Sequence, residues 1–131
     1  MKVKDIMIKI GSFPIIDKKT ILKEALTEMG DANLGLVCII DQNKELLGLI
    51  TDGDLRRKLL KVQKPFSAFF VDDALVHANL NPIVCNPEDD LKKIVTLMGE
   101  KQIWDLPVVN EDQKLVGLLH LHPAVKRLIK G

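Results

Sequence analysis

Gly48-Leu49-Ile50-Thr51-Asp52-Gly53-Asp54 decides the fold of this chain, because the stretch returns in altered form 69 residues later. The second copy reads Gly117-Leu118-Leu119-His120-Leu121-His122-Pro123. In both copies an aliphatic run ends in polar residues, as where a strand leads directly into a helix. The repetition predicts two homologous halves.

Identities between the halves extend well beyond this stretch. At the same offset of 69 the matching pairs include Leu22 with Leu91, Thr27 with Thr96, Met29 with Met98, Gly30 with Gly99, and Leu59 with Leu128. Upstream the offset drops to 68, where residues 14–16 align with 82–84 and residues 3–7 with 71–75. We therefore divide the chain into a first motif, 1–62, and a second motif, 63–131, with a break at 63–67.

The composition is that of a folded protein with an aliphatic core. Of the 131 residues, 47% are hydrophobic and only 4% aromatic, and a half of roughly 60 residues would be marginally stable alone. The net charge of +1 gives no reason to expect nucleic acid or an anionic membrane as partner. No apolar run approaches the ~20 residues of a transmembrane helix, and the start lacks a signal-peptide core, so we expect a cytoplasmic protein. We interpret Cys38 and Cys85 as buried thiols, not as a disulfide or metal pair.

Each half is predicted to contain a strand, a helix, two strands and a second helix. In the first half these are residues 13–16, a helix capped by Thr20 that ends near Gly30, strands 34–40 and 46–50, and a helix over 52–60 with Leu60 on its apolar side. In the second half they are residues 83–85, a helix opened by residues 86–89 with Pro87 at its first position, strands 106–109 and 115–119, and a helix over 123–129 begun by Pro123. The predicted fold class is α/β (α+β), with two β-α-β-β-α motifs.

This order and the opening stretch resemble the tandem CBS domain pair, or Bateman module, over essentially the whole chain. The ligand motif of that family is Gly, a hydrophobic residue, any residue, Thr or Ser, any two residues, and Asp or Asn, which Gly48 to Asp54 fit in full. The resemblance implies that the two motifs pack sheet to sheet with pseudo-twofold symmetry and leave two nucleotide-binding clefts. It implies no required cofactor, a nucleotide ligand such as AMP, ADP, ATP or CMP-Kdo, and a homodimer formed through the CBS pairs.

The extended stretch Thr51-Asp52-Gly53-Asp54-Leu55-Arg56-Arg57 is similar to the module that follows the sugar isomerase domain of D-arabinose-5-phosphate isomerases in Kdo synthesis. Those isomerases usually read Gly-Val-Leu-His-Met-His-Asp in the second repeat, and this chain has Pro123 in place of the Asp. A related module precedes some sugar nucleotidyltransferase domains. We expect the chain to be a C-terminal fragment of such an isomerase or a free-standing module.

The intact motif has residues suited to a nucleotide. The hydroxyl of Thr51 would lie beside helix amides that attract phosphate, Gly53 would let a ligand approach the backbone, and Asp54 could accept from a ribose diol. The other candidate ligand contacts are Gly48 of the same motif, Arg56 and Arg57 for phosphate, Ile16, Leu36 and Val37 as apolar walls, and His120 at the position of Thr51.

Simpler interpretations stand beside these. Thr51-x-x-Asp54 also fits a capping box, and the two arginines also fit a solvated helix face or a subunit contact. His120 and His122 share a strand face without a third ligand nearby in sequence, so no metal site is expected. No nucleophile with a base, and no paired acid and base, is evident, so the chain itself is not expected to be an enzyme.

The predicted function is that of a regulatory CBS pair, which binds a nucleotide or nucleotide-sugar and modulates an attached arabinose-5-phosphate isomerase. Neither nucleic acid nor a membrane is an expected partner. The alternatives are a structural or dimerisation module with decayed clefts, and the regulatory CBS pair of a sugar nucleotidyltransferase. His120 and Pro123 favour the structural module, and the intact first motif speaks against it.

Overall fold

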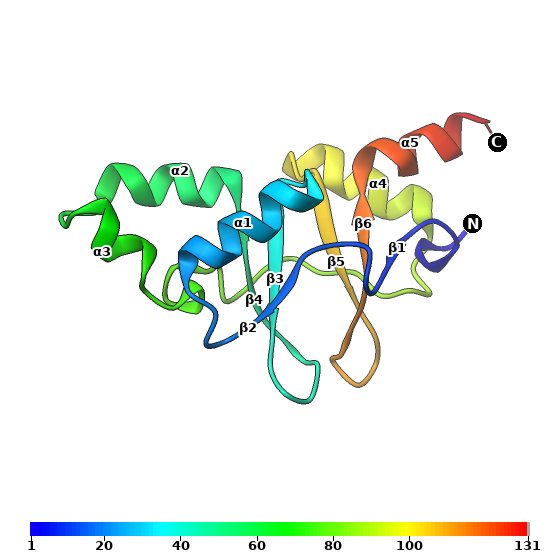
Figure 1. Cartoon of the computed structure of the whole chain (residues 1–131). Coiled ribbons are helices and arrows are strands. Elements are labelled where there is room, and N and C mark those ends of the chain that lie inside the picture. The colour runs from blue at the N-terminus through cyan, green and yellow to red at the C-terminus, as the bar shows by residue number, and fades with distance from the viewer. Residues whose placement is uncertain (131) are drawn as a thin grey trace. The chain divides into compact units, whose positions relative to one another are not determined.

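The computed structural model describes residues 1–130 of the chain (Figure 1). The chain forms two compact units, each with its own three-stranded sheet. The first unit comprises Phe13–Pro82, and the second combines Met1–Ser12 with the chain from Ile83 onward. The predicted α/β fold class is confirmed.

The sheet of the first unit has the strand order β2 (Ile15–Asp17), β3 (Leu36–Ile40), β4 (Leu46–Thr51). β2 is parallel to β3, and β4 is antiparallel to it. The central strand is buried except at its last residue, which explains its unbroken aliphatic sequence. The Asp41 carboxylate closes the following turn by accepting two backbone amides at 2.8 and 2.9 Å.

Four helical segments accompany this sheet: α1 (Leu22–Ala32), α2 (Asp52–Lys61), α3 (Phe66–Phe70) and the 3-10 turn η2 (Ala74–His77). Side chains from three of them and from the strands form one apolar core. Its buried members are Ile16, Leu22, Ala25, Met29, Val37, Ile39, Ile50, Phe69 and Ala74. α2 contributes no fully buried residue and packs on this core through the partly buried Leu55 and Leu59.

The second unit repeats these elements. α4 (Leu91–Lys101), β5 (Asp105–Val109), β6 (Leu115–His120) and α5 (Leu121–Lys130) each begin and end 69 residues after their counterparts. A short strand, β1 (Ile8–Lys9), pairs antiparallel with β6 and gives the order β1-β6-β5. The predicted strand 83–85 is reduced to one parallel bridge between Cys85 and Val108.

The segment before each repeat packs on the other repeat. Residues 1–12 pack on the second repeat, and the segment that ends at Pro82 packs on the first. Equivalent contacts join these segments to the repeats: Lys2 with Asp90 and Asp73 with Ile21, then Ile8 with Leu118 and Asn79 with Leu49. These contacts make Lys2 equivalent to Asp73 and Ile8 equivalent to Asn79, which is an offset of 71. The predicted alignment of residues 3–7 with 71–75, at an offset of 68, is therefore wrong. Val3 and Ala74 are the true equivalents, and both are fully buried. The repeat boundary at 62/63 stays a prediction about the sequence.

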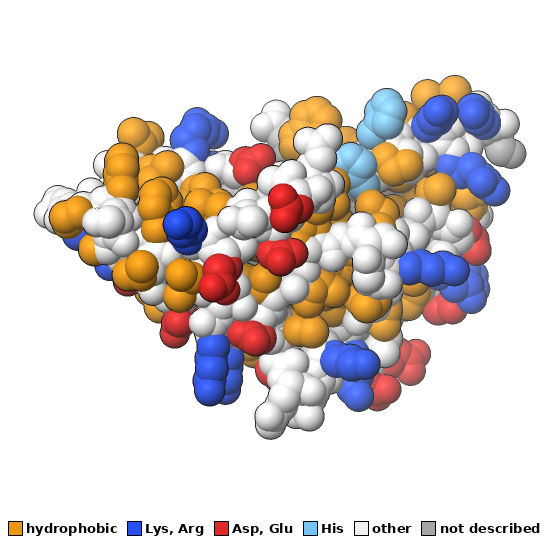
Figure 2. Space-filling model, in the orientation of Figure 1, with side chains coloured by type: hydrophobic (Ala, Val, Ile, Leu, Met, Phe, Trp, Pro, Cys, Tyr) orange, Lys and Arg blue, Asp and Glu red, His pale blue; other side chains and the backbone are white. Residues whose placement is uncertain are grey.

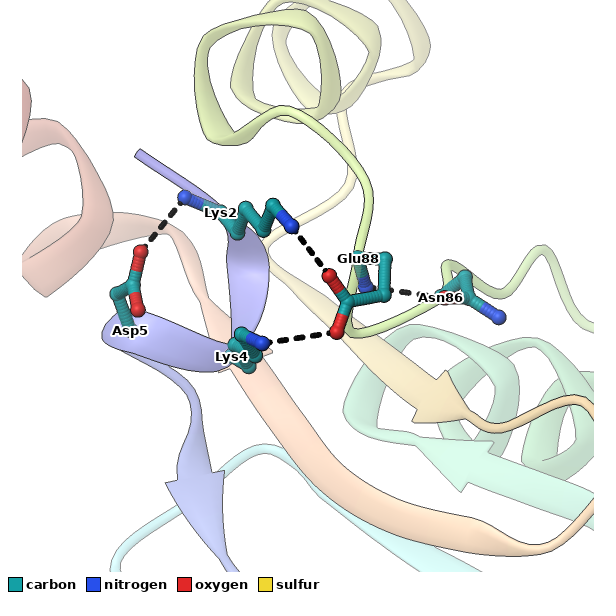
Figure 3. Close-up of polar contacts among 5 residues, drawn as sticks. All are labelled: Lys2, Lys4, Asp5, Asn86 and Glu88. Carbon is teal, nitrogen blue, oxygen red and sulfur yellow. Dashed lines mark hydrogen bonds and ion pairs between the residues drawn. The ribbon is translucent and has the colours of Figure 1, made fainter.

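The N-terminal segment is tied to the loop before α4 by the carboxylate of Glu88 (Figure 3). Lys2 Nζ donates to one of its oxygens at 2.5 Å and Lys4 Nζ to the other at 2.8 Å. Two backbone hydrogen bonds run alongside, from Val3 to Asp89 and from Lys4 to Pro87. The two lysines lower the pKa of Glu88 from 4.5 to about 2.

The predicted start of the first helix is wrong, because the N-cap of α1 is Ile21 and not Thr20. The Thr20 hydroxyl donates instead to Asp17 at 3.1 Å. The amide of Leu22 donates to the carbonyl of Asp72 at 2.8 Å, so a distant backbone segment satisfies the helix start without a side-chain cap.

Docking of a distant backbone segment also displaces the start of α4. Residues 86–89 form a turn, in which Asn86 Oδ1 accepts the amide of Glu88 at 2.9 Å, and Pro87 lies outside the helix. Asp90 is the N-cap, and its carboxylate accepts the amide of Lys93 at 3.2 Å. The carbonyls of the turn accept amides of the N-terminal segment, which fixes the chain in a non-helical course here.

Three smaller predictions are also corrected. α5 begins at Leu121, two residues before Pro123. α1 continues past Gly30 to Ala32 and ends in a left-handed residue, Asn33, which delays the start of β3 to Leu36. Leu60 is 82% exposed, because it is turned by about 100° from Leu59, which faces the core.

Candidate functional site

Thr51 ends β4 and caps α2. Its backbone is extended, with φ −111° and ψ 162°, and its hydroxyl oxygen accepts the amide of Asp54 at 3.1 Å. The hydroxyl hydrogen is not consumed by this bond and can be donated to a ligand. Thr51 is therefore both a helix cap and a candidate hydrogen-bond donor at the end of the sheet.

The Asp54 carboxylate forms an ion pair with Arg57. Arg57 Nη2 donates to Asp54 Oδ1 at 2.7 Å. The Asp54 side chain is 26% exposed and the Arg57 side chain 58% exposed, so the pair borders solvent. Asp54 is thus held in one orientation by Arg57, while its other oxygen remains able to accept from a ligand hydroxyl.

The two glycines of the motif have different surroundings. A Cβ on Gly53 would lie 3.3 Å from Arg57 Nη1, so the bare backbone leaves room for the guanidinium. A Cβ on Gly48 would lie 2.8 Å from the carbonyl oxygen of Asn79, where the chain crosses β4. The crossing accounts for Gly48 as a packing residue, and a ligand contact of Gly48 stays a prediction.

The predicted apolar walls belong to the interior of the first unit. Ile16 and Val37 are members of its core, 7% and 0% exposed, and Leu36 is 1% exposed beside Thr51 on the paired strands. Arg56 is exposed, and no ion pair of its side chain is found within residues 1–130. The structure therefore brings Thr51, Gly53, Asp54 and Arg57 together and leaves Arg56 outside the group.

The second repeat has a different arrangement at the equivalent place. His120 occupies the position of Thr51, and its Nδ1 lies 2.6 Å from Oδ1 of Asp105. Burial raises the pKa of the Asp105 carboxyl, and the hydrogen bond to His120 opposes this rise. His120 was among the predicted site residues, and Asp105 was not. The antiparallel register of the hairpin, which opposes these two residues, was the signal that would have revealed the pair.

The two repeats also differ at a second place, where the sequence alignment sets Trp104 against Gly35. In the first unit the carboxylate of Asp52 lies 2.8 Å from the position of a Cβ on Gly35, so Gly35 has no room for a side chain. The second repeat has Trp104 and Leu121 at these positions, joined by the same backbone hydrogen bond of 2.9 Å. The Trp104 side chain is 70% exposed. The two sites thus differ in shape as well as in charge.

The described residues offer no metal centre, since no three His, Cys, Asp or Glu side chains among residues 1–130 are arranged to hold an ion. Cys38 and Cys85 are both buried, and burial raises the pKa of Cys85 to about 12, which disfavours a reactive thiolate. Within the same residues no helix has the length and apolar character needed to cross a membrane.

Comparison with known proteins finds relatives that match almost the whole chain. The chain is 32% identical to an uncharacterized protein of Helicobacter pylori strain J99 over 133 residues, and 27% identical to the arabinose 5-phosphate isomerase KdsD of Francisella tularensis over 126 residues. These matches cover 100% and 96% of the chain but only 38% and 37% of the relatives. The chain thus spans well under half the length of these proteins.

Solved structures of CBS-domain proteins share the fold of this chain. A structure of CBSX2 in complex with AMP superposes with a TM-score of 0.84 at 25% identity, and covers 98% of this chain and 96% of that one. A CBS domain-containing protein of Bacillus anthracis superposes with a TM-score of 0.86 at 21% identity, over 99% of this chain and 94% of the other. The family model of the CBS domain matches residues 3–61 and again residues 72–122. The chain belongs to the CBS domain family, as a tandem pair.

Proposed function

We propose that this CBS pair is a regulatory module that binds a nucleotide or nucleotide-sugar at Thr51 and Asp54 and thereby modulates an attached arabinose-5-phosphate isomerase. The observation that carries the proposal is the joint geometry of these two residues. A hydroxyl able to donate and an oriented, partly exposed carboxylate lie one helical turn apart at the end of β4.

This geometry suits the polar parts of a nucleotide. The second oxygen of Asp54 can accept from the vicinal hydroxyls of a ribose. The Thr51 hydroxyl and Arg57 can donate to a phosphate. The CBSX2 structure, a complex with AMP, supports an adenine nucleotide as a first candidate ligand. Ile16, Leu36 and Val37 would contribute apolar walls only if the interior opens, because all three are buried.

The attached enzyme is proposed from the relatives. KdsD proteins of Francisella tularensis and Salmonella typhi match almost the whole chain, which accounts for 37% of their length. The remainder of such a protein would supply catalysis, and the CBS pair would supply control. CMP-Kdo is then a second candidate ligand, and a cytoplasmic location fits the two buried thiols. A sugar nucleotidyltransferase is the alternative parent.

Thermal shift and calorimetry against AMP, ADP, ATP, S-adenosylmethionine and CMP-Kdo test the proposal. We expect at least one of these to bind, and Asp54→Ala to abolish the response. Asp31→Ala is the matched control, since Asp31 is an exposed carboxylate on α1 of the same unit. A flat response to every compound, or binding that survives Asp54→Ala, would reject the nucleotide site.

A structural or dimerisation role is the second candidate. Figure 2 shows hydrophobic side chains gathered over α1, α2 and α3, and the exposed ones on the first unit include Leu60, Phe66, Val71, Val76 and Leu80. Such a patch favours contact with a second copy. Light scattering tests it: a dimer that Leu60→Glu dissociates supports self-association, and a monomer at high concentration contradicts it.

A further inference from the structure

We infer that Arg57 makes the first-repeat site select phosphorylated nucleotides over the corresponding nucleosides, by placing a positive charge beside the Asp54 carboxylate. The inference rests on the nucleotide-binding function proposed above. It gives Arg57 a role distinct from that of its neighbour Arg56, which stands two residues after Asp54 and so does not face it on the helix.

Two independent contacts fix the Arg57 guanidinium at the start of α2. Nη2 donates to Asp54 Oδ1 at 2.7 Å. The same group lies over Gly53, where an added Cβ would be 3.3 Å from Nη1 and 3.4 Å from Nη2. Gly53 therefore provides the space into which the guanidinium folds, and Asp54 provides the charge that retains it there.

The charges at this place make an arginine necessary for an anionic ligand. The first turn of α2 carries two carboxylates, Asp52 and Asp54. Both would repel a phosphate, and only Asp54 has a cation bonded to it among the described residues. The ion pair uses one of the five N–H donors of the guanidinium, and the 58% exposure of the side chain leaves others within reach of a ligand.

The two parts of a nucleotide therefore depend on different residues. A ribose needs the free oxygen of Asp54, which a nucleoside and a nucleotide can use equally. A phosphate needs in addition the positive charge beside that carboxylate. Loss of Arg57 should weaken the binding of a nucleotide and leave the binding of its nucleoside almost unchanged.

The experiment compares AMP with adenosine, and CMP with cytidine, by calorimetry on the wild type and on Arg57→Ala, Arg57→Lys, Gly53→Ala and Arg56→Ala. Arg57→Ala should weaken the binding of the nucleotide by about tenfold, the usual size of a charge-assisted hydrogen bond, and the binding of the nucleoside by less than about twofold.

Arg57→Lys should restore part of the preference for the nucleotide. Gly53→Ala, whose Cβ would press on the guanidinium from 3.3 Å, should act in the same direction as Arg57→Ala and more weakly. Arg56→Ala is the matched control, with the same loss of charge at an exposed site, and should change neither affinity.

Each contrary result overturns the inference. Equal weakening of nucleotide and nucleoside by Arg57→Ala means a structural role, and an equal effect of Arg56→Ala means a general effect of net charge. If the wild type binds nucleosides and nucleotides equally well, selectivity is absent while the proposed function stands. If the wild type binds none of the four compounds, the inference fails, and the screen of five compounds described above decides separately whether the proposed function fails. Thermal unfolding of every variant separates these results from a loss of fold.

Discussion

His120 Nδ1 lies 2.6 Å from Asp105 Oδ1, where the end of β6 pairs with the start of β5. The first repeat has Thr51 and Leu36 in these two places. The second repeat thus replaces a hydroxyl beside a leucine with an imidazole held by a carboxylate whose side chain is only 10% exposed. A partly buried carboxylate needs a partner, so the two substitutions form one unit.

We predict that these substitutions are energetically coupled. His120→Thr alone leaves Asp105 without its partner and should cost roughly 1 to 3 kcal/mol of unfolding free energy. Asp105→Leu alone removes the acceptor from His120, and the double variant restores the pair of the first repeat. The loss of unfolding free energy in the double variant should therefore be smaller than the sum of the two single losses, by about 1 kcal/mol or more. Urea unfolding measures all three, and additivity within about 0.5 kcal/mol would show that the contact is incidental.

Local signals in the sequence predicted the repeated elements well. The offset of 69 holds for both bounds of α1, β3, β4 and α2, because each helix and strand is specified by its own apolar periodicity. The cap at Thr51 was predictable for the same reason, since the donor and acceptor lie three residues apart. These features need no knowledge of distant segments.

The failures arise where a distant segment docks. Thr20 and Pro87 carry good local start signals, but amides and carbonyls from residues 72–74 and 1–4 fill the places that a cap would serve. Tertiary contacts such as these override local propensity without leaving a pattern in the sequence. The ion pair between Asp54 and Arg57 was also missed, although the i,i+3 spacing of these two residues on a helix is a local signal for it.

Acid should loosen the N-terminal segment through Glu88. Its pKa is lowered in the folded state from 4.5 to about 2, so its contribution to stability is complete above pH 4.5 and is lost as the pH falls toward 2. Glu88→Gln should remove this part of the pH dependence, and the effect should shrink in high salt because Lys2, Lys4 and Glu88 are each about half exposed. The measurement is thermal unfolding at several pH values. Glu111→Gln, at an exposed turn, is the control and should leave the slope unchanged.

The glycines that face a crossing segment should not tolerate a methyl group. A Cβ on Gly48 would meet the backbone oxygen of Asn79 at 2.8 Å, so Gly48→Ala should destabilise the fold by roughly 1 to 3 kcal/mol. Gly117→Ala should cost less, because its nearest contact at 2.6 Å is the flexible side chain of Met7. Gly99→Ala, in open space within α4, should instead stabilise by about 0.5 to 1 kcal/mol. Chemical denaturation ranks the three variants, and equal costs for Gly48→Ala and Gly99→Ala would contradict the crossing.

Thr51→Asp separates the two roles assigned to Thr51. An aspartate caps a helix at least as well as a threonine, so stability should remain within about 0.5 kcal/mol of the wild type. The same carboxylate has no hydrogen to donate and repels phosphate, so the affinity for AMP should fall by about tenfold or more. Thr51→Ala should lose both properties, with roughly 1 kcal/mol of stability removed along with the cap.

Urea unfolding and AMP calorimetry on the two variants distinguish the roles. If Thr51→Asp binds AMP like the wild type, Thr51 acts only as the cap of α2, and its hydroxyl has no part in a site. If Thr51→Asp loses as much stability as Thr51→Ala, the added charge beside Asp52 and Asp54 outweighs the cap, and a loss of binding could not be assigned to the hydroxyl. Thr51→Ser keeps both the cap and the donor, so this variant should match the wild type in stability and in affinity.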